Sequence, residues 1–166
     1  MRILIVDDET SIRRTTALAV KSMGHEPFEA TSAVRALKVL EEEGCEVCFL
    51  DLKLGSEDGL EVLARLQKAY PAVAVVMFTA YATIATAVEA MRRGAFDFIP
   101  KPFTPDQIRQ VLDKLTRARR LESRVHQLES QLAAESPPSE FISAEPSVQK
   151  ALDIAFKAAE TPATIL

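Results

Sequence analysis

Residues 3–9 have the sequence Ile3-Leu4-Ile5-Val6-Asp7-Asp8-Glu9, in which four apolar residues are followed at once by three acidic ones. A nearly continuous apolar run of this length is typical of a parallel β-strand that is covered on both faces. Comparable runs occupy residues 47–50 and 73–78, and weaker ones occupy residues 25–29 and 96–99. The sequence therefore predicts five strands.

Between these runs, apolar residues recur with a spacing of about 3.6 residues, which is typical of amphipathic helices. The fourth helical stretch, for example, carries Ile84, Val88 and Met91. The stretches stop near residues that commonly end helices: Gly24, Gly44, Pro71 and Gly94. Regular alternation of strands and helices predicts an α/β fold, an open doubly wound parallel sheet with helices on both faces.

The composition argues for a folded, soluble protein. Of the 166 residues, 48% are apolar, which is enough for a core of ordinary domain size. The 20 basic and 24 acidic side chains give a net charge of −4, which offers no support for a nucleic-acid-binding body. The N-terminal apolar run is too short for a signal peptide, and the uncharged stretch at 72–88 is too short and too polar to span a membrane. We expect a cytoplasmic protein that does not enter a membrane.

Two cysteines, Cys45 and Cys48, have a C-x-x-C spacing. A zinc site would need two further ligands, and the only histidines, His25 and His126, are far away in the sequence. A thioredoxin-like redox pair is the alternative. Because the cysteines lead into the apolar run at 47–50, we interpret them as reduced core residues.

Polar residues cluster at the predicted strand ends. Asp7 and Asp8 follow the first strand, Asp51 follows the third, Thr79 ends the fourth and Lys101 follows the fifth. The carboxyl ends of parallel strands meet at one edge of the sheet, which is where ligands bind in such folds. We therefore expect these five side chains to lie in one pocket.

Three carboxylates in one pocket repel one another unless a cation is bound. Mg²⁺ fits best, because it prefers carboxylate oxygens and also recruits phosphate oxygens. Lys101 and Thr79 could then hold a phosphoryl group, and one carboxylate could attack phosphorus to form an acyl phosphate.

After Pro105 the chain has no glycine or proline as far as residue 135. Ile108, Leu112 and Leu115 form a stripe suited to lying on the sheet. Farther along, the apolar residues follow the a/d spacing of a coiled coil: Leu121, Val125, Leu128 and Leu132. We predict a linker helix over 117–136 that pairs in parallel with a second chain; the alternative is a lone helix that packs on its own domain. Interspersed glutamates indicate that the arginines of this region form a solvated face: Arg117, Arg119, Arg120 and Arg124.

Five segments together resemble the receiver domain of bacterial two-component response regulators. They are ILIVDDE (3–9), FLDL (49–52), DGL (58–60), TAY (79–81) and GAFDFIPKPF (94–103). The resemblance covers residues 1–116 and implies a flavodoxin-like fold in which Asp51 accepts a phosphoryl group from a sensor histidine kinase. It also implies that Mg²⁺ is bound by Asp7, Asp8, Asp51 and the backbone carbonyl of Lys53.

The same resemblance assigns the remaining polar residues. Thr79 and Lys101 would bind the phosphoryl group, and Thr79 and Phe98 would act as the conformational switch. The segment 54–58 departs from the common pattern, which often has proline and methionine there, and we expect a more mobile loop.

In its details the chain resembles NtrC-type regulators, which are sigma-N-dependent transcriptional activators. In these proteins a receiver, a linker helix, an AAA+ ATPase and a DNA-binding domain follow one another. Residues 137–166 resemble the start of the ATPase, before its Walker A motif. We expect a truncated chain whose full-length parent binds ATP, DNA and sigma-N RNA polymerase.

Three alternatives compete with this interpretation. A haloacid-dehalogenase-like phosphohydrolase would need a D-x-D motif, whereas Asp7 and Asp8 are adjacent and Asp51 lies on another strand. A pseudo-receiver would dimerise through its linker without phosphorylation. A Rossmann domain would need G-x-G-x-x-G after the first strand, which is missing.

Overall fold

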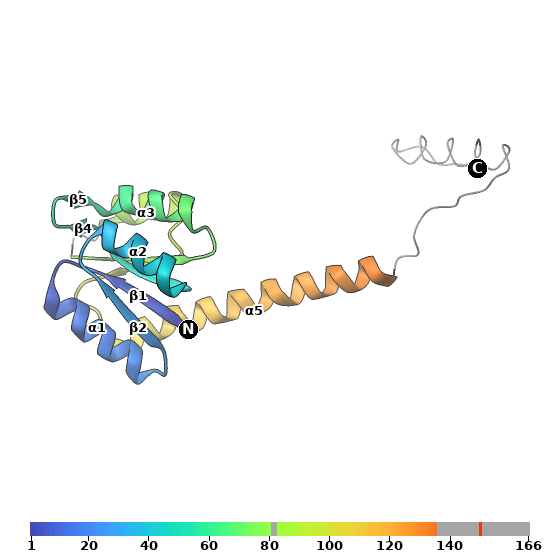
Figure 1. Cartoon of the computed structure of the whole chain (residues 1–166), viewed down its shortest axis with the longest axis horizontal. Coiled ribbons are helices and arrows are strands. Elements are labelled where there is room, and N and C mark those ends of the chain that lie inside the picture. Colours follow the sequence, from blue (N-terminus) through green and yellow to red (C-terminus); the bar gives the residue numbers. More distant parts are fainter. Residues whose placement is uncertain (81–82, 136–149, 151–166) are drawn as a thin grey trace. The chain divides into compact units, whose positions relative to one another are not determined.

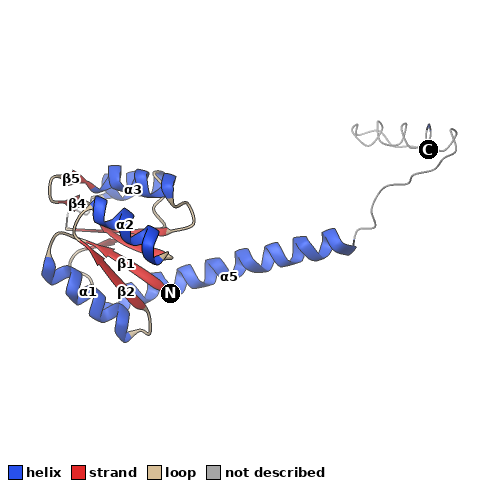
Figure 2. Ribbon diagram, viewed as in Figure 1, coloured by secondary structure: helices blue, strands red, loops and turns tan. Residues whose placement is uncertain are grey.

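The computed structural model describes residues 1–80, 83–135 and 150. Its main sheet has five parallel strands in the order β2-β1-β3-β6-β7 (Figures 1 and 2). These strands are β1 (Arg2–Val6), β2 (Glu26–Ala30), β3 (Val47–Asp51), β6 (Ala74–Thr79) and β7 (Asp97–Pro100). The predicted doubly wound, flavodoxin-like α/β fold is confirmed, and each strand end differs from the predicted one by at most one residue.

Helices cover both faces of the sheet. Successive side chains of β1 point to opposite faces, so each face contributes to a separate core. Leu4 and Val6 face a core formed with α2, α3 and α4, while Ile3 and Ile5 face a second core formed with α1 and α5. Figure 1 shows α1 and α2 on opposite sides of the sheet. The helices are α1 (Thr10–Ser22), α2 (Ala33–Glu43), α3 (Gly59–Ala69), α4 (Ile84–Arg92) and α5 (Pro105–Glu135).

A two-stranded hairpin, β4 (Lys53–Leu54) with β5 (Glu57–Asp58), follows the third strand of the main sheet. This hairpin replaces the predicted loop, and it could not be predicted because strands of two residues carry no periodicity. Gly55 in the turn has a φ of +62°, a conformation that glycine adopts without strain. The Glu57 carboxylate accepts a hydrogen bond from the backbone N–H of Ala33, at 3.1 Å, at the start of α2.

The apolar spacing of the fourth helical stretch correctly predicts α4, but the side chains that carry the spacing are exposed. Ile84, Val88 and Met91 are 87%, 52% and 47% exposed, whereas Ala90 is buried. The helix therefore packs through a small residue and presents an apolar stripe on its surface.

Cys45 and Cys48 are both free and buried, as predicted for core residues. Burial raises the pKa of the Cys45 thiol to about 11, so the reactive thiolate form is disfavoured at neutral pH.

The last helix, α5, begins against the sheet, where Ile108, Leu112 and Leu115 are buried. Burial of each such side chain is worth roughly 1.5–3 kcal/mol. Met1–Arg119 form one compact unit, and the helix continues to Glu135. The second unit, Arg120–Leu166, is described only as far as residue 135 and at residue 150, so most of the predicted ATPase segment lies outside the described residues. Within the described part of the chain, no helix has both the length and the apolarity that a membrane span requires.

Candidate functional site

Asp7 lies at the carboxyl end of β1 and is almost completely buried. Its backbone N–H donates to the carbonyl of Ala30, at 3.2 Å, which extends the pairing with β2 by one residue. One carboxylate oxygen accepts from the backbone N–H of Glu9, at 2.9 Å, and the other accepts from the Lys101 ammonium, at 2.6 Å. The orientation of the Asp7 side chain is therefore fixed at both oxygens.

Asp51 is the last residue of β3 and is also buried. The Lys101 Nζ lies 3.1 Å from Asp51 Oδ2, so one ammonium bridges the carboxylates of Asp7 and Asp51. The backbone N–H of Lys101 donates to the carbonyl of Thr79, at 2.7 Å, which places the lysine beside the end of β6.

Opposing effects act on the pKa values of these groups. Burial is the largest cause that raises the pKa of Asp51, and Asp7 adds to it, while Lys101 and the backbone N–H of Lys53 oppose it. Burial is also the largest single effect on Lys101 and lowers its pKa, but hydrogen bonds and charge interactions with Asp7 and Asp51 together raise it. Lys101 consequently stays charged, but its one positive charge does not balance the carboxylates of Asp7, Asp8 and Asp51.

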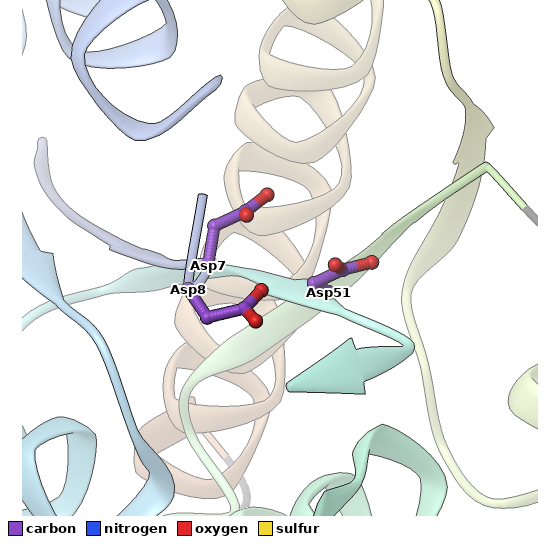
Figure 3. A group of neighbouring side chains, drawn as sticks. All are labelled: Asp7, Asp8 and Asp51. Carbon is purple, nitrogen blue, oxygen red and sulfur yellow. The ribbon is translucent and has the colours of Figure 1, made fainter. Parts of the chain in front are cut away.

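The three aspartates meet at this edge of the sheet (Figure 3). Asp7, Asp8 and Asp51 each offer a carboxylate oxygen within 4.8 Å of the others, and Asp8 is exposed. Such a set of hard oxygen donors, one of them open to solvent, fits Mg²⁺. These residues could hold the ion, which would supply positive charge to both the carboxylates and a phosphoryl group.

A pocket of about 330 Å³ opens beside the cluster. The residues that line it are Asp8, Glu9, Asp51, Lys53, Gly55, Ala80 and Lys101. Thr79 is fully buried at the end of β6. Phe98 lies in β7 next to Met77 and packs, partly buried, against the core on the α2 side of the sheet. Among the predicted site residues, therefore, Asp8, Asp51, Lys53 and Lys101 share the pocket lining.

Gly59, at the start of α3, is a site residue whose role the sequence analysis missed. A Cβ atom at this position would lie 2.6 Å from the Cα and 2.7 Å from the carbonyl oxygen of Leu52, and closer still to the carbonyl oxygen of Asp51. The backbone N–H of Gly59 also donates to that Leu52 carbonyl, at 2.7 Å. The sequence signal for this contact is the DGL segment at 58–60.

Comparison with known proteins gives a match to the family described as response regulator receiver domain, over residues 3–113. The chain belongs to this family. It is a receiver domain of a two-component response regulator, and such domains imply a phosphodonor histidine kinase as partner. A chain of this family is a signalling module. The match therefore excludes the haloacid-dehalogenase-like phosphohydrolase and the Rossmann domain.

The chain is also similar to longer curated response regulators. The alginate biosynthesis transcriptional regulatory protein AlgB of Pseudomonas aeruginosa is 38% identical over 165 residues, which are 99% of this chain and 36% of the relative. An NtrX-like response regulator of Rickettsia felis is 44% identical over 108 residues, covering 64% of this chain and 23% of the relative. The chain thus spans about a third or less of these relatives.

Solved structures of response regulators are also similar to this chain. NtrX from Brucella abortus in complex with ADP has a TM-score of 0.72 at 32% identity, covering 95% of this chain and 35% of that one. The receiver domain of NtrX from the same organism has a TM-score of 0.65 at 40% identity, covering 68% of this chain and 95% of that one.

Proposed function

We propose that Asp51 accepts a phosphoryl group from a phosphohistidine of a sensor kinase, in a reaction that requires Mg²⁺. The ion would be held by Asp7, Asp8, Asp51 and the backbone carbonyl of Lys53. The observation that carries this proposal is the bridging ammonium of Lys101, 2.6 Å from Asp7 and 3.1 Å from Asp51, beside a solvent-accessible third carboxylate.

In the transfer step, a carboxylate oxygen of Asp51 attacks phosphorus. The new P–O bond forms as the P–N bond of the donor breaks, and the imidazole departs with the bonding electron pair and takes up a proton. When Mg²⁺ is bound by the aspartates, it would offset negative charge on the transferring group. Lys101, whose ammonium lies 2.6 Å from Asp7 and 3.1 Å from Asp51, would donate to one phosphoryl oxygen.

The phosphoryl group then biases the conformation of the domain. It brings about two negative charges next to the end of β6, where the Thr79 hydroxyl can donate to a phosphoryl oxygen. Movement of Thr79 leaves space for Phe98, the partly buried ring in β7. The result is a population shift between two packings around β6 and β7. Hydrolysis of the acyl phosphate within the same site returns Asp51 to its starting state.

We further propose that the switch controls pairing of two chains through the linker over 117–136. Leu121, Val125, Leu128 and Leu132 are 68%, 53%, 44% and 65% exposed and follow a/d spacing, which supports a parallel coiled coil. Residues 137–166 would then begin the AAA+ domain of a full-length regulator that acts on ATP, DNA and sigma-N RNA polymerase. Relatives whose names include transcriptional regulation support this extension.

Phosphate-affinity electrophoresis after treatment with acetyl phosphate and Mg²⁺ tests the phosphorylation step. Wild type is expected to give a retarded band, and Asp51→Asn is expected to give none. Asp106→Asn, which changes a highly exposed aspartate at the start of α5, is the matched control and should label like wild type. Equal labelling of Asp51→Asn and wild type would refute the proposal, and loss of label on chelation of Mg²⁺ tests the metal requirement.

A further inference from the structure

Arg13 is a nearly buried cation that the phosphorylation mechanism does not use. It lies in the first turns of α1, and its side chain is only 11% exposed. A charged side chain is rarely buried to this extent unless it is paired and hydrogen-bonded. The partners of the guanidinium therefore indicate why it is there.

One arm of the Arg13 guanidinium donates to the backbone carbonyl of Asp7, Nη1 to O, at 2.9 Å. The Nε donates to the Glu29 carboxylate, also at 2.9 Å, which orients the guanidinium from the side of β2. A longer contact of 3.4 Å joins Nη2 to the Thr10 hydroxyl. The guanidinium thus connects α1, β2 and the turn that carries the acidic pair.

With this contact, every polar group of Asp7 has a partner. The backbone N–H donates to Ala30, and the two carboxylate oxygens accept from Glu9 and Lys101. The backbone carbonyl, which is the link to Asp8, is held by Arg13. Rotation of that peptide unit would redirect the Asp8 side chain, which is the exposed member of the carboxylate cluster.

We propose that Arg13 is a positioning residue for the divalent-cation site: it acts through the Asp7 carbonyl to hold the Asp7-Asp8 turn in its binding orientation. This inference rests on the proposed function, because it assumes that the cluster binds Mg²⁺. Partners that orient metal ligands typically contribute roughly 10–100-fold to affinity. We expect about tenfold here, since Arg13 orients the backbone and not a carboxylate directly.

A purely structural role makes a different prediction. If the Arg13–Glu29 pair only ties α1 to β2, Arg13→Ala and Glu29→Gln should lower stability alike and leave Mg²⁺ affinity unchanged. If Arg13 positions the turn, Arg13→Ala should weaken Mg²⁺ binding. Glu29→Gln should weaken it less, because the contact from Arg13 to Asp7 remains.

The experiment titrates the full chain with MgCl₂ and follows the amide chemical shifts of Asp8 and Glu9. Arg14→Ala is the matched control, since Arg14 is the neighbouring arginine in the same helical turn and is exposed. We expect the dissociation constant for Mg²⁺ to rise about tenfold in Arg13→Ala and to change less than twofold in Arg14→Ala. Thermal unfolding of each variant separates loss of folding from loss of affinity.

Each outcome decides one question. Wild type that does not bind Mg²⁺ refutes the proposed metal site itself. Wild-type binding together with unchanged affinity in folded Arg13→Ala overturns the positioning role alone. If Arg13→Ala does not fold, Arg13→Lys replaces it: a single ammonium cannot reproduce both the Nε and Nη1 contacts, so affinity should still fall about fivefold. Wild-type affinity in that variant would equally overturn the inference.

Discussion

Substitution of Gly59 by alanine tests whether α3 starts in direct contact with the backbone of Asp51, the proposed phosphoacceptor, and Leu52. Gly59 is not among the described glycines with positive φ, so alanine meets no conformational penalty there. The penalty is steric, because the new Cβ would lie 2.6 Å from the Leu52 Cα and 2.7 Å from the Leu52 carbonyl oxygen. Relief requires a shift of roughly 1 Å, given that non-bonded carbon atoms pack about 3.5–4.0 Å apart.

Both sides of this contact are backbone, so no side chain can rotate to relieve it. Overpacking of a well-packed core costs roughly 1–3 kcal/mol, and a rigid backbone contact belongs at or above the upper end of that range. We therefore expect Gly59→Ala to lose about 3 kcal/mol of unfolding free energy, which corresponds to a fall in Tm of about 10 °C for a domain of this size. Phosphorylation of Asp51 should slow as well, because the strained atoms include the carbonyl of that residue.

Urea denaturation followed by circular dichroism measures the loss. Gly24→Ala is the control for a conformational penalty alone: Gly24 has a φ of +82°, and a Cβ there meets nothing within 4 Å. Its expected cost is about 1–2 kcal/mol, the penalty for placing an ordinary residue in the left-handed region. A loss in Gly59→Ala no greater than in Gly24→Ala would refute the steric argument.

Two further predictions concern pH and pairing. Burial is the main cause that lowers the pKa of His25 in the folded protein below its ordinary value of 6.5. The folded state therefore favours the neutral imidazole: the contribution of His25 to stability is fully present above pH 6.5 and is lost as pH falls through the folded-state pKa. Between about pH 7.5 and about 5.5, the unfolding free energy of wild type should therefore fall more than that of His25→Gln; equal losses in urea denaturation would contradict this. For the proposed coiled coil, Leu128→Lys should weaken dimerisation at least about tenfold, because it places a charge in the apolar seam. Sedimentation velocity measures this against Ser130→Lys, which adds the same charge outside the a/d stripe; equal dimerisation of the two variants would exclude Leu128 from the interface.

The sheet and its acidic edge could be predicted because their signals are local. β1, β3 and β6 are nearly continuous apolar runs, and Asp7, Asp51 and Lys101 stand at the ends of β1, β3 and β7. The carboxyl-edge rule for parallel sheets then converts positions along the chain into neighbours in space.

Residues whose partners are backbone atoms could not be predicted in this way. Arg119 was assigned to a solvated helix face, but its guanidinium donates to the carbonyls of Glu46, at 2.8 Å, and Ala72, at 3.3 Å, at the start of β3 and β6. Arg13 was missed for the same reason. A backbone carbonyl has no residue type, so the sequence does not mark it as a partner for a cation. The assignment was wrong for Arg119, whereas Arg117, Arg120 and Arg124 are exposed.

The charge balance of the cluster explains why one pocket could serve both a cation and a phosphoryl group. When ionised, Asp7, Asp8 and Asp51 carry three negative charges against the one positive charge of Lys101, an excess of two. A divalent cation matches that excess, and the exposed side chain of Asp8 gives it access. A phosphoryl group on Asp51 would replace one carboxylate charge by about two negative charges, so it shifts the balance again at a point where Lys101 is already divided between two partners. The Lys101 ammonium has three N–H donors and could also serve a phosphoryl oxygen, but its single positive charge does not offset the added negative charge. We therefore propose the Thr79 hydroxyl as a further donor to the phosphoryl group, since the backbone carbonyl of Thr79 accepts a hydrogen bond from the Lys101 N–H, at 2.7 Å.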